Sequence, residues 1–113
     1  MAKAMREPTF WILTALVDQA RHGYGIIQQA ASLSDGQVTL QAGTLYAALD
    51  RLHAEGLVAI DHDETVDGRP RRYYRLTRGG VAALQEETTR LERNASTASR
   101  QLAARRHLGE ATA

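Results

Sequence analysis

The chain contains one strong hairpin signal between helical patterns, and this order limits the folds open to it. Residues 57–63 (LVAIDHD) and 71–77 (RRYYRLT) are two short β-prone runs that flank Asp67-Gly68. An Asp-Gly pair between such runs is typical of a tight turn joining antiparallel strands. The sequence therefore predicts a single β-hairpin in a mostly helical chain.

Three helical patterns precede the hairpin. We expect a first helix from Pro8 that ends at His22-Gly23, a second from Tyr24 to the turn at 34–36, and a third from Gln41 to Gly56. Residues 38–40 predict at most a stub of strand. The apolar stripes of the three helices consist of Phe10, Leu13, Leu16, Val17 and Ala20, then Ile26, Ile27, Ala30 and Leu33, then Leu45, Leu49 and Leu52.

A long helix is expected after the hairpin. Thr77 is a suitable N-cap for a helix of about thirty residues from Arg78 to near Leu108. Its stripe of apolar and small residues is too narrow for a core of its own, and nothing follows to cover it, so we expect a homodimer. The expected dimerisation residues are Val81, Leu84, Leu91, Ala95, Ala98 and Leu102, together with Trp11 of the first helix.

Trp11 has three open interpretations. It lies off the main stripe of its helix, on the side of Ala15 and Asp18. It either packs within its own chain, faces the partner's last helix or lines an effector cavity.

Three helices followed by a hairpin is the order of a winged helix-turn-helix. The expected fold class is thus mainly α with a small β-hairpin. Residues 1–77 would form the DNA-binding domain, 78–108 the dimerisation helix and 109–113 a frayed tail. In this fold the third helix enters the major groove of DNA, and the hairpin, or wing, lies along the backbone or minor groove.

Arginines are concentrated in the wing although the whole chain has a formal net charge of only +1. Guanidinium groups bind phosphate oxygens bidentately, so we expect DNA contacts from Arg69, Arg71 and Arg72. Cross-strand pairing with acidic residues is the structural alternative for one or two arginines, and exposed pairs add little stability. Arg75 and Arg78 are the candidates for such pairing, and the acidic residues available are Asp61, Asp63, Glu64 and Asp67.

The first turn of the third helix offers free backbone amides, a small glycine and hydroxyl groups. These suit phosphates and base edges, so the expected DNA-binding residues here are Gln41, Gly43, Thr44 and Tyr46. Arg51 lies further along the helix. It either contacts a phosphate or pairs with Glu55, four residues on.

Three segments resemble the PadR family of bacterial transcriptional regulators: HGYGI (22–26), GTLYAALDRLHAEGLV (43–58) and DGRPRRYYRLTRGG (67–80). The resemblance covers residues 8–80 and is closest to the compact subclass without a separate C-terminal domain. It implies a homodimeric repressor that reads two half-sites of a pseudo-palindromic operator in double-stranded DNA. By motif, Thr44 and Tyr46 correspond to positions of the DNA-reading helix, and Tyr24 opens the second helix near the DNA backbone. Gly68, Arg69, Arg71 and Arg72 match the wing.

The chain departs from this family pattern in two places. Gln41-Ala42 and Ala47 stand where many members have Ser-Pro before GTLY and Pro after it, which weakens the N-cap of the third helix. Some compact members bind flat aromatic drugs between tryptophans of the last helix, but here that helix contains no aromatic residue. A stacked drug site is therefore not expected, and the identity of any small-molecule effector is open.

Several classes of site and function are not expected. The chain has no cysteine, which suits the reducing cytoplasm, and no run approaches the ~18 apolar residues of a membrane span. His62 is flanked by acidic residues, but neighbours on a strand point to opposite faces, so we expect no metal site. No nucleophile–base set or phosphate loop appears, so we expect neither an enzyme nor a cofactor. The alternative function is a winged-helix module that binds protein or RNA.

Overall fold

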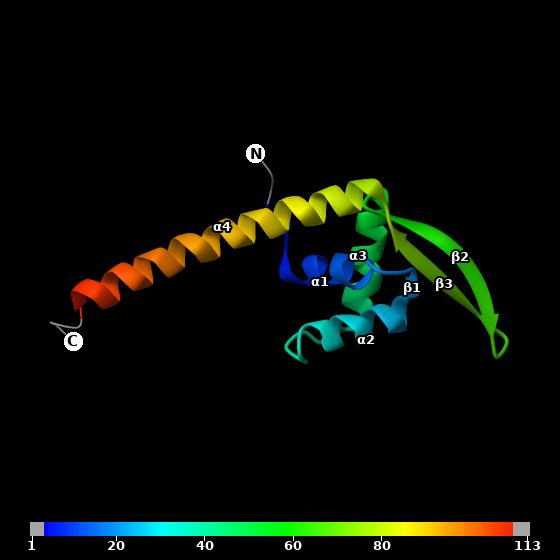
Figure 1. Cartoon of the computed structure of the whole chain (residues 1–113). Coiled ribbons are helices and arrows are strands. Elements are labelled where there is room, and N and C mark those ends of the chain that lie inside the picture. The colour runs from blue at the N-terminus through cyan, green and yellow to red at the C-terminus, as the bar shows by residue number, and fades with distance from the viewer. Residues whose placement is uncertain (1–3, 110–113) are drawn as a thin grey trace.

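The computed structural model describes residues 4–109, which fold into a small body, a wing and a long helix (Figure 1). The expected fold class is confirmed: a winged helix-turn-helix followed by a long C-terminal helix. The described part contains no helix that combines the length and hydropathy of a membrane span. In chain order the elements are α1 (Glu7–Ala15), β1 (Arg21–His22), α2 (Gly23–Leu33), α3 (Ala42–Ala54), β2 (Val58–Val66), β3 (Arg69–Leu76) and α4 (Arg78–Gly109).

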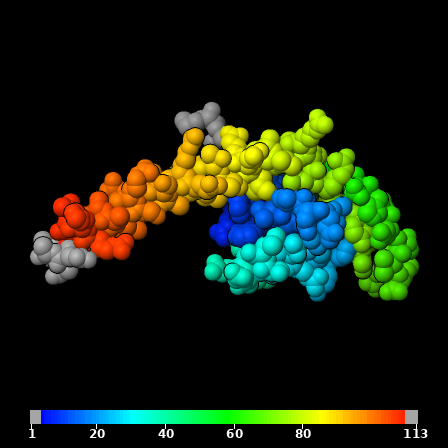
Figure 2. Space-filling model, in the orientation of Figure 1, coloured from blue at the N-terminus to red at the C-terminus, as the bar shows by residue number. Residues whose placement is uncertain are grey.

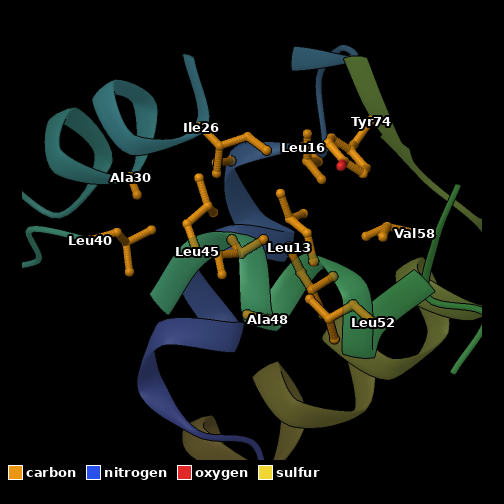
Figure 3. Close-up of a cluster of buried hydrophobic side chains, with 13 residues drawn as sticks. Leu13, Leu16, Ile26, Ala30, Leu40, Leu45, Ala48, Leu52, Val58 and Tyr74 are labelled. Atoms are coloured by element: carbon orange, nitrogen blue, oxygen red, sulfur yellow. The ribbon is translucent and has the colours of Figure 1, made fainter. Parts of the chain in front are cut away.

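The core forms around α3. Leu45, Leu49 and Leu52 recur at helical spacing on one face of this helix and are fully buried, as the sequence predicts. Figure 3 shows this face of α3 between side chains of α1, α2 and the sheet. The side chains packed around α3 include Leu13, Leu16, Ile26, Ala30, Val58 and Tyr74.

The expectation of one helix up to His22-Gly23 is wrong, because α1 ends at Ala15. The Arg21 side chain explains the end: its Nε donates a hydrogen bond to the Ala15 carbonyl oxygen at 2.9 Å. Its Nη2 also forms a salt bridge with Asp18 at 3.0 Å. The earlier end also changes the buried stripe, since Val17 lies beyond the helix and is exposed while Ile12 is fully buried.

The sheet has three antiparallel strands in the order β1-β3-β2, one more than the expected hairpin. Arg21 pairs with Tyr74 and His22 with Tyr73, so the third strand comes from the segment before α2. Residues 38–40 form no strand; Leu40 is instead buried in the core. A two-residue strand has no periodicity, and this is why the sequence did not reveal it.

The hairpin turn is the one predicted. Asp67 and Gly68 have φ angles of 52° and 76°, and two successive positive φ values suit the twist of a two-residue hairpin. The register shifts between Ile60 and His62, so Asp61 forms a bulge in β2.

Thr77 caps α4 as expected and also joins it to the end of α3. The Thr77 hydroxyl oxygen accepts a hydrogen bond from the Gly80 amide at 3.0 Å, and the hydroxyl donates one to the Gly56 carbonyl at 2.6 Å. The helix includes Gly109, one residue beyond its expected end, and the rest of the expected frayed tail, 110–113, lies outside the described residues.

Gly80 allows the start of α4 to lie directly on Leu57. A Cβ atom at position 80 would lie 2.1 Å from the Leu57 carbonyl oxygen and 2.6 Å from Leu76 Cδ1. Since a backbone atom is the nearest neighbour, no rotation of a side chain could make room.

We expect Gly80→Ala to lower the free energy of unfolding by about 1–3 kcal/mol, because the added methyl group overpacks this joint. Urea denaturation measures the change. Gly43→Ala is the control: a Cβ there meets no atom within 4 Å, so it should be neutral or stabilise by up to about 1 kcal/mol. Equal effects of the two substitutions would contradict close packing at Gly80.

Candidate nucleic-acid interface

A polar hollow of about 610 Å³ lies between the start of α2, one side of α3 and the wing. It brings together five of the residues that were expected to bind DNA, from three separate segments: Tyr24, Tyr46, Arg69, Arg71 and Arg72. The wing provides Val66, Asp67 and Pro70 as well. The complete lining is His22, Gly23, Tyr24, Tyr46, Val66, Asp67, Arg69, Pro70, Arg71 and Arg72.

The wing arginines divide into paired and unpaired groups. Arg72 lies opposite Asp63 and forms a salt bridge with it at 3.0 Å, which lowers the pKa of the Asp63 carboxyl group. Arg75 lies 3.8 Å from Asp61. Within residues 4–109, Arg69 and Arg71 form no salt bridge.

Cross-strand pairing thus accounts for Arg72 and Arg75, and leaves the two arginines nearest the turn available. Arg72 was expected to contact DNA. Its side chain lines the hollow while it forms the salt bridge with Asp63. Arg75 pairs with an acidic neighbour, Asp61, which is one of the alternatives that the sequence left open.

The first turn of α3 is exposed next to this hollow. Gln41, Gly43 and Thr44 are all exposed, and no atom of the chain lies within 4 Å of a Cβ built on Gly43. Gln41 is the N-cap residue, but its side chain makes no capping hydrogen bond. The amides of this turn therefore receive no capping hydrogen bond from Gln41.

Arg51 lies apart from the other candidates. Its guanidinium forms a salt bridge with Glu55 at 3.1 Å and donates a hydrogen bond to the Thr9 hydroxyl of α1 at 2.9 Å. It lines a second hollow, of about 580 Å³, next to α1 and α4. Of the two alternatives left by the sequence, the structure supports the ion pair with Glu55.

His22 caps α2 and also contacts the wing. Its Nδ1 accepts a hydrogen bond from the Gly25 amide at 3.2 Å, and its ring meets the Tyr73 ring edge-on at 5.2 Å. Burial lowers the pKa of His22, the positive charge of Arg71 lowers it further, and Glu64 opposes this change. The sequence predicted His22 as the end of the first helix and did not predict this cap; histidine is not a preferred N-cap residue.

His62 packs against the other side of the wing's tyrosine. Its ring stacks on Tyr73 at 4.4 Å, and its nitrogens contact carboxylates of Asp61 and Glu64, whose hydrogen bonds raise the pKa of His62. The expectation that Asp61 would point away is wrong, since the bulge at Asp61 brings its carboxylate to the histidine.

Two of the expected dimerisation residues contact their own chain. Leu84 of α4 and Trp11 of α1 are half-buried and pack against the core. The Trp11 ring also meets Phe10 edge-on at 5.2 Å. Packing, the first of the three interpretations of Trp11, therefore describes its contacts within the protomer. The remaining expected residues are exposed: Val81, Leu91, Ala95, Ala98 and Leu102.

The body and wing define the class of protein, a winged helix-turn-helix with a long C-terminal helix. The sequence profile of the Transcriptional regulator PadR-like family matches residues 12–86, and the chain belongs to this family. A transcriptional regulator of Mycobacterium tuberculosis is 42% identical over 81 residues, which cover 72% of each chain.

Solved structures show the same fold. A PadR-like transcription factor from Bacteroides fragilis has 28% sequence identity and a TM-score of 0.70, with 82% of this chain and 87% of that chain covered. A PadR family regulator from Eggerthella lenta has 27% identity and a TM-score of 0.69, covering 84% and 80%. Bacillus subtilis PadR, solved in complex with operator DNA, has 21% identity and a TM-score of 0.64, covering 72% and 47%.

We expect acid to weaken the contribution of His22 to stability. The folded state lowers the pKa of His22, so the unfolded state binds more protons and the stability due to neutral His22 is lost as the pH falls below about 6.5. His22→Asn keeps a capping acceptor but does not titrate. The free energy of unfolding of wild type minus that of His22→Asn should fall between pH 7.5 and 5 in denaturation experiments; a constant difference would contradict the capping role of neutral His22.

Proposed function

We propose that the protein is a homodimeric repressor of transcription in the cytoplasm. It binds a pseudo-palindromic operator in double-stranded DNA through α3 and the wing, and a small-molecule effector of unknown identity releases it. The observation that carries the proposal is the shared hollow of α2, α3 and the wing, in which two arginines have no acidic partner among the described residues.

The first turn of α3 suits the major groove. Its opposite face is buried by leucines, so the helix presents Gln41, Gly43 and Thr44 outward on a rigid support. Side-chain amides and hydroxyls form hydrogen bonds with base edges, and free amides at a helix start suit phosphates. We therefore assign base contacts to this turn, and a phosphate contact to the Tyr46 hydroxyl beside it.

The wing suits the DNA backbone or minor groove. Arg69 and Arg71 are exposed near the turn, and neither must break a salt bridge to reach a phosphate. Arg72 contributes positive charge from its pair with Asp63, and Tyr24 lies across the hollow at the start of α2. The fold relative from Bacillus subtilis in complex with operator DNA supports this kind of partner.

The C-terminal half of α4 supports dimerisation. Figure 2 shows it extending as an arm past the body, and residues 91–108 are all exposed. Within residues 4–109 nothing covers the stripe formed by Leu91, Ala95, Ala98 and Leu102, and Leu102 is 63% exposed. A second copy of this helix would bury the stripe, and the small alanines allow close approach.

We expect Arg69→Ala with Arg71→Ala to weaken operator binding and to flatten its dependence on salt. If each of the four arginines removed from the dimer neutralises one phosphate, the slope of log K against log salt decreases in magnitude by about 3.6. Fluorescence anisotropy with a labelled duplex, over a salt series, measures both quantities. The operator can be obtained by selecting bound fragments from the source genome.

The control for this experiment is Arg93→Ala with Arg100→Ala, which removes the same charge from the arm of α4, far from the wing (Figure 1). It should leave the affinity and the salt slope nearly unchanged. Equal losses in both variants would rule out a specific role of the wing. A wild-type protein that ignores duplex DNA and binds RNA or a protein would instead support the alternative of an interaction module.

We expect Leu91→Glu with Leu102→Glu to convert the dimer to a monomer, because four charges would then be buried at the helix pair. Light scattering measures the mass, and operator affinity should fall at least about tenfold as the two half-sites are no longer bound together. Thr89→Glu with Ala104→Glu is the matched control, since positions two residues away lie on nearly the opposite side of the helix. A dimer that survives the leucine substitutions would refute this use of α4.

A further inference from the structure

Gly23, the first residue of α2, lies directly under the ring of Tyr46 on α3. A Cβ atom at position 23 would lie 2.3 Å from Tyr46 Oη, 2.7 Å from Cζ and 3.1 Å from Cε1. The three nearest atoms all belong to this one side chain. The tyrosine ring thus occupies the space that the side chain of any other residue at position 23 would need.

This requirement for glycine comes from close approach and not from backbone conformation. Gly23 does not have the positive φ of Gly36, Gly56 and Gly68. Gly25, two positions further into the same turn, is different. A Cβ atom there would meet Arg21 Cβ at 3.6 Å, which is ordinary contact.

The contact holds a half-exposed side chain in one place. Tyr46 is 49% exposed, so without a neighbour its ring could sample several rotamers on the surface of α3. Against Gly23 the ring lies at the edge of the hollow, next to the capped start of α2 and across from the wing arginines. Ordering it before DNA arrives removes an entropy cost from binding.

We propose that Gly23 is a positioning residue for DNA binding: it acts through Tyr46, by seating the tyrosine ring at the hollow and setting the approach of α2 to α3. The inference rests on the proposed function, because its partner is the backbone of duplex DNA. It also explains why a glycine follows His22, a position where alanine would favour the helix.

A double-mutant cycle tests this coupling. Gly23→Ala should displace the ring and weaken binding of the selected operator duplex about tenfold or more. In a Tyr46→Ala background the same substitution should have little further effect, because there is no ring to displace. Affinity is measured by anisotropy under conditions where denaturation curves show each variant to be folded.

Gly25→Ala is the control, and it should keep wild-type affinity. Additive effects of Gly23→Ala and Tyr46→Ala on affinity, or wild-type affinity of Gly23→Ala, would overturn the inference. If Gly23→Ala alone fails to fold, recovery of folding in the double variant supports the contact, and continued failure refutes it.

The failure of the proposed function would look different. In that case the wild-type protein itself would show no salt-dependent binding to the duplex. The double-mutant cycle of positions 23 and 46 would then be measured through the free energy of unfolding of each variant. Coupling of positions 23 and 46 there, without DNA binding, would reduce Gly23 to a purely structural residue and so reject its role in binding.

Discussion

The burial of one face of α3 is the constraint on which the rest of the structure depends. Leu45, Leu49 and Leu52 are completely removed from solvent, and they belong to one core cluster with side chains of α1, α2, β2 and β3. Since a helix has only one such face, the burial of these leucines leaves the opposite side of α3 exposed. The same contacts that stabilise the body therefore present Gln41, Gly43 and Thr44 outward.

A joint formed by Thr77 and Gly80 links the wing to the long helix. Thr77 follows β3, caps α4 and donates a hydrogen bond to Gly56 at the end of α3, while Gly80 lets α4 lie on Leu57. The wing, the end of α3 and the start of α4 thus meet within a few residues. In a dimer held together by α4, this joint would set the spacing of the two wings and of the two copies of α3.

Sequence reasoning located the wing but could not tell how its arginines divide. Composition places Arg69, Arg71, Arg72 and Arg75 in one strand, and alternation of faces alone does not choose their partners. The register sets Arg72 opposite Asp63, and the bulge at Asp61 moves that carboxylate toward both Arg75 and His62. Bulges and registers arise from the pairing of two strands, so they have no signature in one strand.

Arg51 shows the same limit on α3. Its spacing to Glu55 was visible in the sequence, and left a phosphate contact and an ion pair equally open. The Thr9 hydroxyl, 42 positions away, binds the guanidinium from α1 and ties Arg51 to the side next to α4. Only the packing of α1 against α3 distinguishes the two roles.

The sequence by itself determined the order of the helices, the Asp67-Gly68 turn and the Thr77 cap. Each of these depends on neighbours within a few residues, through helical periodicity, positive φ or a capping hydroxyl. The tertiary structure decided the end of α1, the third strand at Arg21-His22, the absence of an acidic partner for Arg69 and Arg71 among the described residues, and the position of the Tyr46 ring over Gly23. Apart from the end of α1, where Arg21 reaches back six residues to Ala15, these features depend on segments far apart in the chain, and their contacts form only once the core has brought those segments together.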